Sequence, residues 1–157
     1  MITLKKLEEN FEAFSKDFKQ KLADLGSTLS KPRLINIQIP NTTFDLADGE
    51  IYIGATISAD GNNYATILLP GDKDDGNWQD AMDWAKAQGG DLPNRIEQAV
   101  LFAQFQEEFK KDVYWSNTQH ASYDGYAWCQ YFGSGFQGYG GKSYFDIRAR
   151  AVRRVQI

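Results

Sequence analysis

The sequence has little of several residue types on which specialised sites depend. Its 157 residues include one cysteine, Cys129, and one histidine, His120. A single cysteine excludes an internal disulfide and any paired-cysteine metal or redox site, and a single histidine excludes a histidine-rich metal site. We therefore expect no metal site and no cofactor.

Positive charge and long apolar runs are also scarce. The formal net charge is −4 and the isoelectric point is about 5.0, so attraction to nucleic acid or to an anionic membrane is not expected. No apolar run approaches the length of a membrane span, and the first residues, MITLKKLEENF, are too charged for a secretory signal. We expect a protein that is made and folded in a cytoplasm.

Apolar residues recur in a heptad pattern over residues 3–29, and this pattern predicts one amphipathic helix. Such an apolar stripe is covered either by copies of the same helix or by the chain's own domain. We favour self-association, and a trimer in particular, because several phenylalanines fit a wide bundle better than a tight dimer. The predicted oligomerisation residues are Leu4, Leu7, Phe11, Phe14, Phe18 and Leu25.

Strand and helix signals follow this segment. Residues 34–39, 49–58 and 63–70 are predicted strands, and Asp60-Gly61 predicts a hairpin between the last two. Residues 113–157 are predicted to form short strands and glycine-rich loops, ending in an alternating strand at 148–156. The final strand carries a basic cluster.

Two helices are predicted between these strands. Asn77 caps the first, at 78–88, and Gly89-Gly90 stops it. Asn94 caps the second, which we expect to run to about Phe109 and to close a capping box with Glu97. The expected apolar face of the second helix consists of Ile96, Val100, Phe102, Ala103 and Phe105.

Residues 114–145 hold half of the chain's aromatic residues and six of its 14 glycines. They form either a core with little regular structure or a recognition surface. We favour the surface, because tyrosine among serine, glycine and asparagine gives a large, rigid contact area at low entropic cost. Alternation in YAWCQYF, residues 126–132, separates the large rings from Ala127 and Cys129. The predicted contact residues are Asn117, Gln119, His120, Tyr123, Tyr126, Phe136, Gln137, Tyr139 and Tyr144.

The basic cluster RARAVRR suggests a second kind of site. Alternation places Arg148, Arg150 and Arg154 on one face, which would bind an anion if it were exposed. The alternative is pairing with carboxylates from the two helices. Both interpretations remain open at this point.

A catalytic constellation is not expected. Cys129 lies in an apolar strand, which predicts a buried and unreactive thiol. His120 has no cysteine or carboxylate close to it in the sequence. DKDDGN, residues 72–77, misses the spacing of a calcium-binding EF-hand loop by one place and is predicted to be a solvated turn. These features predict a non-enzymatic protein.

The order of motifs resembles that of a family of small phage and prophage proteins of unassigned function. Their C-terminal domain is similar to that of the Legionella collagen-like protein. The resemblance covers roughly residues 34–157 and rests on GEIYIG, ILLPGD, W-x-D-A-x-x-WA, GG-x-LP-x-R-x-EQ-x-x-LF, YWS, AW-x-Q-x-F, G-x-Q, KSY and RARAVRR. It implies an α+β, C-type-lectin-like domain at 31–157, with two helices, a small twisted antiparallel sheet, long loops, and Trp115 and Trp128 in the core. Residues 1–30 would be a helical oligomerisation segment.

Together these observations predict a homo-oligomeric binding protein of a phage or prophage that recognises a host protein or a surface glycan. It would be a virion accessory or receptor-binding protein, made in the host cytoplasm and assembled into the virion. An alternative is an intracellular inhibitor that binds a component of a host defence system. An enzyme, and a structural trimer without a ligand, are the remaining alternatives.

Overall fold

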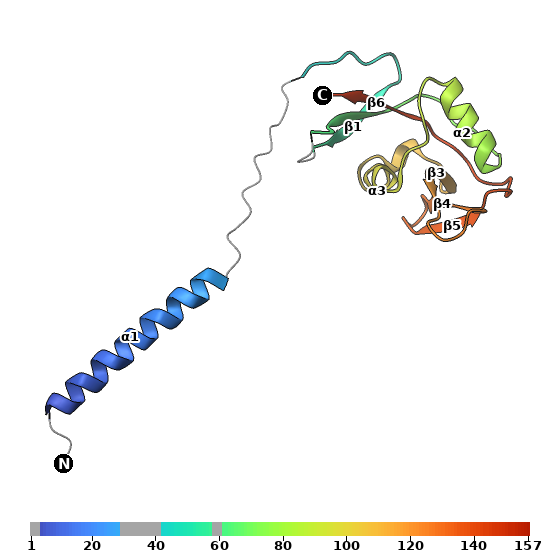
Figure 1. The fold of residues 1–157 in the computed structure, drawn as a ribbon. Helices are drawn as coiled ribbons and strands as arrows, with labels where there is room; N and C mark the ends of the chain where they lie inside the picture. Colours follow the sequence, from blue (N-terminus) through green and yellow to red (C-terminus); the bar gives the residue numbers. More distant parts are fainter. Residues whose placement is uncertain (1–3, 29–41, 58–60) are drawn as a thin grey trace. The chain divides into compact units, whose positions relative to one another are not determined.

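The computed structural model describes residues 4–28, 42–57 and 61–157 (Figure 1). The chain divides into two compact units, Met1–Asn36 and Ile37–Ile157. Three helices and two small antiparallel sheets make it a mixed α+β protein. The strand predicted at 34–39 lies outside the described residues. None of the described helices is long and apolar enough to cross a membrane.

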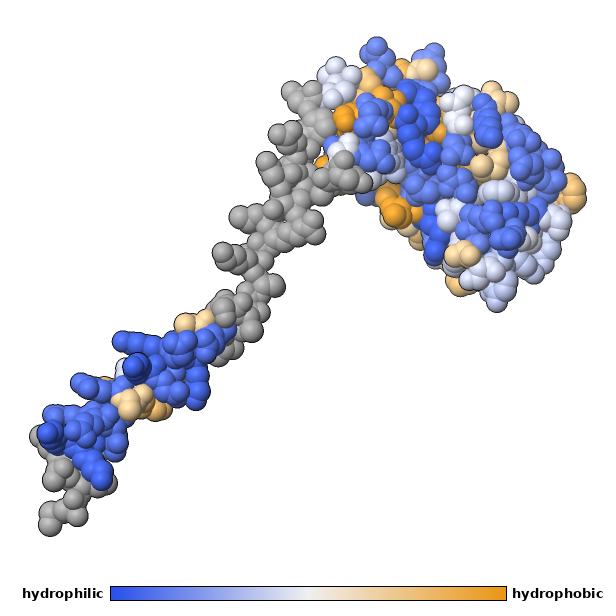
Figure 2. All heavy atoms as spheres, in the orientation of Figure 1, coloured by the Kyte–Doolittle hydropathy of each residue, from blue (hydrophilic) through white to orange (hydrophobic). Residues whose placement is uncertain are grey.

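The first unit contains helix α1 (Leu4–Thr28), close to the predicted span. Its apolar stripe is exposed: Phe11, Phe14, Phe18 and Leu22 retain between 53% and 72% of their accessible surface. The rings of Phe14 and Phe18 stack on each other with their centroids 6.2 Å apart. Figure 2 shows the resulting hydrophobic spheres on an otherwise hydrophilic helix. The apolar stripe is therefore uncovered within the described residues of its own unit.

The first sheet of the second unit has the order β1-β2-β6 and is antiparallel throughout. Its strands are β1 (Ile51–Thr56), β2 (Tyr64–Leu68) and β6 (Val152–Gln156). The predicted hairpin between β1 and β2 is confirmed. The final strand begins at Val152 instead of Arg148, because residues before it form single bridges to two separate segments, at Lys73 and Tyr114.

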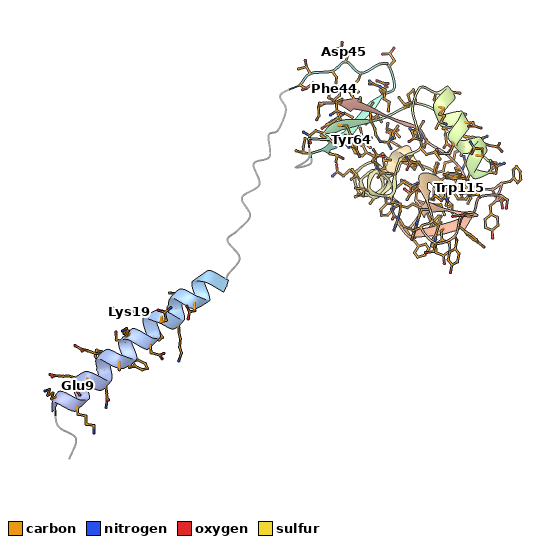
Figure 3. The ribbon with its side chains drawn as sticks, in the orientation of Figure 1. Glu9, Lys19, Phe44, Asp45, Tyr64 and Trp115 are labelled. Carbon is orange, nitrogen blue, oxygen red and sulfur yellow. The ribbon has the colours of Figure 1, made fainter. Side chains whose placement is uncertain are left out.

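The second sheet has the order β3-β4-β5 and separates two apolar cores. Its strands are β3 (Val113–Gln119), β4 (Tyr126–Tyr131) and β5 (Gln137–Gly141). Trp115, labelled in Figure 3, belongs to a core with Ala127 and Cys129 that also includes two alanines of helix α2 (Trp78–Ala87). Tyr114, the preceding residue, points to a second core with Leu101 of helix α3 (Arg95–Gln104).

The two predicted helix caps are confirmed. Helix α2 (Trp78–Ala87) begins where the Asn77 side chain accepts a hydrogen bond from the Asp80 amide. Helix α3 (Arg95–Gln104) begins with the capping box of Asn94 and Glu97. It ends earlier than predicted, and a short 3₁₀ turn, Gln106–Glu108, follows it.

The predicted apolar face of α3 is only partly correct: Phe102 and Phe105 pack against the second core, but Ile96 and Ala103 are exposed. Ile96 is 76% exposed, whereas Glu97, Gln98 and Leu101 are buried. The cause is the Glu97 carboxylate, which accepts hydrogen bonds from Arg154 Nη2 at 2.6 Å and Nε at 2.8 Å, and from the Thr66 hydroxyl at 3.1 Å. These hydrogen bonds hold the polar side of the first turn of α3 toward the first sheet.

The predicted exposed arginine face does not form, because all three guanidinium groups form ion pairs with carboxylates or hydrogen bonds with backbone carbonyls. Arg148 pairs with Asp72, Asp74 and Asp112. Arg150 is buried and donates to the carbonyls of Glu108 and Leu69, and burial lowers its pKa. Arg154 pairs with Asp91 and Glu97. The cluster is thus paired, as the alternative predicted, but only Glu97 of these carboxylates lies on a helix, and Arg150 has backbone carbonyls as its partners.

Glu50 attaches the segment before β1 to strand β6. Its carboxylate accepts hydrogen bonds from Arg153 Nε at 2.6 Å and Nη2 at 2.7 Å, and from the Ala47 amide at 2.8 Å. The hydrogen bond from Arg153, followed by that from Ala47, lowers the pKa of Glu50 from 4.5 to about 2. The folded state therefore favours the ionised form of this carboxylate.

We predict that Glu50→Gln lowers the free energy of unfolding by about 1–3 kcal/mol at pH 7, since it removes charge-assisted hydrogen bonds. The pKa of Glu50 is lower in the folded state than in the unfolded state, so the ionised carboxylate stabilises the fold. This stabilisation is complete above pH 4.5 and is lost as the pH falls toward 2. Urea unfolding of both proteins should give a constant difference from pH 7 to pH 5 and a shrinking one below it. An equal difference at pH 3 would contradict this account.

Candidate functional site: an aromatic surface

Five rings meet on the second sheet and the loop between β3 and β4, and we call them the aromatic surface. They are His120, Tyr123, Tyr126, Trp128 and Tyr139. The ring centroid of His120 lies 4.6 Å from that of Tyr139, 4.8 Å from that of Tyr123 and 5.7 Å from that of Trp128. The three tyrosines are between 40% and 56% exposed. The rings therefore form one connected and solvent-accessible patch.

The alternation of β4 explains why the patch lies on this face. Ala127 and Cys129 point into the core beside α2, so Tyr126 and Trp128 point to the opposite face. Along that face Tyr126 is exposed, Trp128 is partly buried and Gln130 is buried. The Gln137 side chain, which donates to Gln130, also donates to the backbone of the first residue of α3. In Figure 3 ring side chains line the edge of the unit around β4 and β5.

Backbone hydrogen bonds fix the loop that carries His120 and Tyr123. The His120 amide donates to the Tyr126 carbonyl at 3.0 Å, and the Tyr126 amide donates to the Tyr123 carbonyl at 3.0 Å. The Ser122 amide donates to His120 Nδ1 at 3.2 Å. Because each ring-bearing residue is tied at its backbone, the rings have a defined arrangement without a ligand.

Arg95, the first residue of α3, covers the indole of Trp128. The guanidinium carbon lies 3.4 Å from the ring centroid, a close cation–π contact. Gln137 holds Arg95 from two sides: its Oε1 accepts from Arg95 Nε at 3.2 Å, and its Nε2 donates to the Arg95 carbonyl at 2.7 Å. Gln137, predicted to contact a ligand, thus orients the arginine beside the aromatic surface.

The other predicted contact residues have different surroundings. Asn117 donates to the Asp91 carboxylate at 2.7 Å and so joins the ion pairs of Arg154. Gln119 donates to Asp124 at 3.4 Å within the loop after β3. Phe136 and Tyr144 are highly exposed, but neither ring contacts the aromatic surface within the described residues.

Trp128 is not a core residue, contrary to the prediction. It is partly exposed and packs against Arg95, His120 and Tyr139. Alternation does separate Trp128 from Ala127 and Cys129, which lie in the core, while Tyr126 and Tyr131 are exposed. Ala127 and Cys129 are small enough to pack beneath α2, so their face of β4 lies in the core.

Cys129 is buried, and the acidic side chains after β2 are paired with other residues. Burial raises the pKa of the Cys129 thiol to about 11, which disfavours the reactive thiolate. The turn that follows β2 is not simply solvated: Asp72 accepts from the Tyr114 hydroxyl at 3.0 Å, and Asp74 pairs with Arg148 and Lys110. Among the described residues, no group of three or more His, Cys, Asp or Glu side chains is arranged to hold a metal ion.

Comparisons with known proteins do not assign the chain to a family. No family model matches it, and a search of the curated proteins finds no match. The aromatic surface and the exposed stripe of α1 are the features of the described residues that bear on function.

We predict that Arg95→Ala uncovers the indole of Trp128 and lowers stability by only about 1 kcal/mol, the typical strength of an exposed cation–π contact. A soluble paramagnetic agent should then relax the Trp128 indole N–H faster in NMR spectra. The signal of Trp115, which is fully buried, is the internal reference. Lys142→Ala removes the cation 4.4 Å from Trp78 and should leave the Trp128 signal unchanged. Equal relaxation in wild type and Arg95→Ala would contradict the contact.

Proposed function

We propose that this chain is a non-enzymatic binding protein whose aromatic surface recognises a host protein or a surface glycan. The observation that carries the proposal is the connected set of five rings, three of them tyrosines at least 40% exposed. Large exposed rings gathered in one place are unfavourable for a soluble protein unless they serve an interaction. Tyrosine and tryptophan also supply much of the binding energy at protein interfaces.

The order of the rings makes the surface suitable for recognition. The Tyr126 and Tyr139 rings meet edge to face, with centroids 5.8 Å apart, and Tyr123 meets Tyr126 in the same way. A side chain that is already fixed loses little entropy when a partner binds. The pale area around β3–β5 in Figure 2 reflects side chains that are neither strongly hydrophilic nor strongly hydrophobic.

We further propose that the second unit is a C-type-lectin-like domain of a phage or prophage protein. The mixed architecture, with helices α2 and α3, two small sheets and long connections, supports this assignment. The order of motifs described above is its other support. In such domains the loops carry the variable contact surface, which agrees with the loop position of His120 and Tyr123, whereas Tyr126, Trp128 and Tyr139 lie on strands.

Helix α1 is proposed to hold several copies together, with a trimer as the favoured state. Support comes from the exposed stripe of Phe11, Phe14, Phe18 and Leu22 along one helix. Joining several copies raises the overall affinity of a shallow binding surface, because linked copies convert weak single contacts into high avidity. The same surface would serve a virion protein or an intracellular inhibitor of host defence.

We expect Tyr139→Ala to weaken capture of a host partner at least about tenfold, because it removes a ring that contacts three others. The tagged full-length protein would be used to capture partners from host lysate, beside a mass-spectrometric inventory of purified virions. Tyr52→Ala is the matched control, since Tyr52 is similarly exposed on β1. Equal loss in both variants, or unchanged capture with Tyr139→Ala, would refute the role of the aromatic surface.

We expect Phe11→Asp with Phe14→Asp to convert the oligomer to a smaller species, because charges in an apolar seam oppose its burial. Light scattering measures the mass directly. Glu9→Gln with Glu12→Gln changes exposed charges on the same helix and should leave the mass unchanged. A wild-type chain that is already monomeric would end the proposal.

A further inference from the structure

Arg95 differs from the other arginines that the structure describes. Each of the other four uses its terminal guanidinium nitrogens in hydrogen bonds or ion pairs: Arg148, Arg150, Arg153 and Arg154. Arg95 uses only Nε, which donates to Gln137. Its two terminal nitrogens have no hydrogen-bond or ion-pair partner among residues 4–28, 42–57 and 61–157. Up to four N–H donors are therefore available for a ligand.

The free end of Arg95 is held in place before any ligand arrives. Trp128 stacks against the guanidinium, and Gln137 fixes both Nε and the backbone carbonyl. Gln137 is itself held, because its Nε2 donates to Oε1 of the buried Gln130 at 3.0 Å. A guanidinium fixed in this way loses less entropy on binding than one on a freely moving side chain.

The guanidinium lies in a shallow hollow beside the aromatic surface. The hollow is lined by Asn94, Arg95, Ile96, Ala99, Thr118 and Gln137. Ile96 is 76% exposed and provides an apolar wall next to the charge. The Thr118 hydroxyl has only a long contact, 3.4 Å, to Asn117 Oδ1. The hollow thus combines a fixed cation, a hydroxyl and an apolar wall.

This combination selects one kind of anion. The planar fork of a guanidinium matches a carboxylate, which accepts two parallel hydrogen bonds from it. A polyanion such as nucleic acid does not fit, because the net charge is −4 and Asp124 lies next to Tyr123 in the same loop. A single carboxylate with an apolar or aromatic neighbour suits the hollow.

We propose that Arg95 is the specificity-determining residue of the binding surface and that it takes an Asp or Glu side chain of a protein partner. This inference rests on the proposed function of the aromatic surface. Arginine, tyrosine and tryptophan together are the usual residues of strong protein–protein contacts. A glycan is less well served, because sugars stack on an open ring face and the Trp128 face is covered by Arg95. The three tyrosines also meet edge to face and leave no flat platform.

The test is selection of random displayed peptides on the immobilised full-length protein, beside an array of sialylated and uronic-acid glycans. We expect selected peptides to carry an Asp or Glu next to an apolar or aromatic residue. For a synthetic copy of such a peptide, changing the acid to its amide should raise the Kd for wild type at least about tenfold. With Arg95→Gln the same change should have no effect. Lys86→Gln on α2 removes an equal charge elsewhere and should bind as wild type does.

The outcomes separate this inference from the proposed function. Peptides without an acid, or peptides whose acid matters equally in Arg95→Gln, overturn the role of Arg95, while loss of binding in Tyr139→Ala still supports the aromatic surface. Peptides that bind Tyr139→Ala normally overturn the proposed function. Capture of acidic glycans with no selected peptide overturns the protein partner, and absence of any ligand overturns both. If Arg95→Gln fails to fold, Arg95→Lys and the comparison of acid with amide on wild type give the same decision.

Discussion

The buried carboxylate of Glu97 is the interaction on which the second unit depends. It accepts the Asn94 amide in the cap of α3, two N–H groups of Arg154 on β6 and the hydroxyl of Thr66 on β2. Burial alone would lower the pKa of Arg154, but its hydrogen bonds and ion pairs with Glu97 and Asp91 raise it. One carboxylate thus joins a helix start to two strands, and its loss would leave Arg154 with Asp91 as its remaining ion-pair partner among the described residues.

The same helix start also reaches the aromatic surface. Arg95, two residues before Glu97, contacts Trp128 and Gln137 of the second sheet. The side-chain amide of Gln137 also donates a hydrogen bond to the side-chain carbonyl of the buried Gln130. The start of α3 therefore takes part in two hydrogen-bonded groups, one with the first sheet through Glu97 and one with the aromatic surface through Arg95.

The elements predicted well are those whose signals are local. Asn77 and Asn94 cap helices because a side-chain oxygen reaches an amide two or three residues away, and this depends on nothing else in the fold. In the candidate site, tyrosine-rich composition drew attention to His120, Tyr123, Tyr126 and Tyr139, and the structure places these four rings together. Composition did not identify which face of β4 lies in the core, because that depends on where α2 packs.

The sequence by itself determined the caps, the hairpin, the heptad stripe of α1 and the aromatic content of residues 114–145, since each depends on neighbours a few residues apart. Only the tertiary structure decided that Trp128 is partly exposed, that the arginines of the basic cluster are paired, and that Arg95 has no ion-pair partner among the described residues. Arg95 is separated from Gln137 by 42 residues, so no local pattern contains both partners. The physical reason is that burial and pairing of a charge are set by groups brought together by packing.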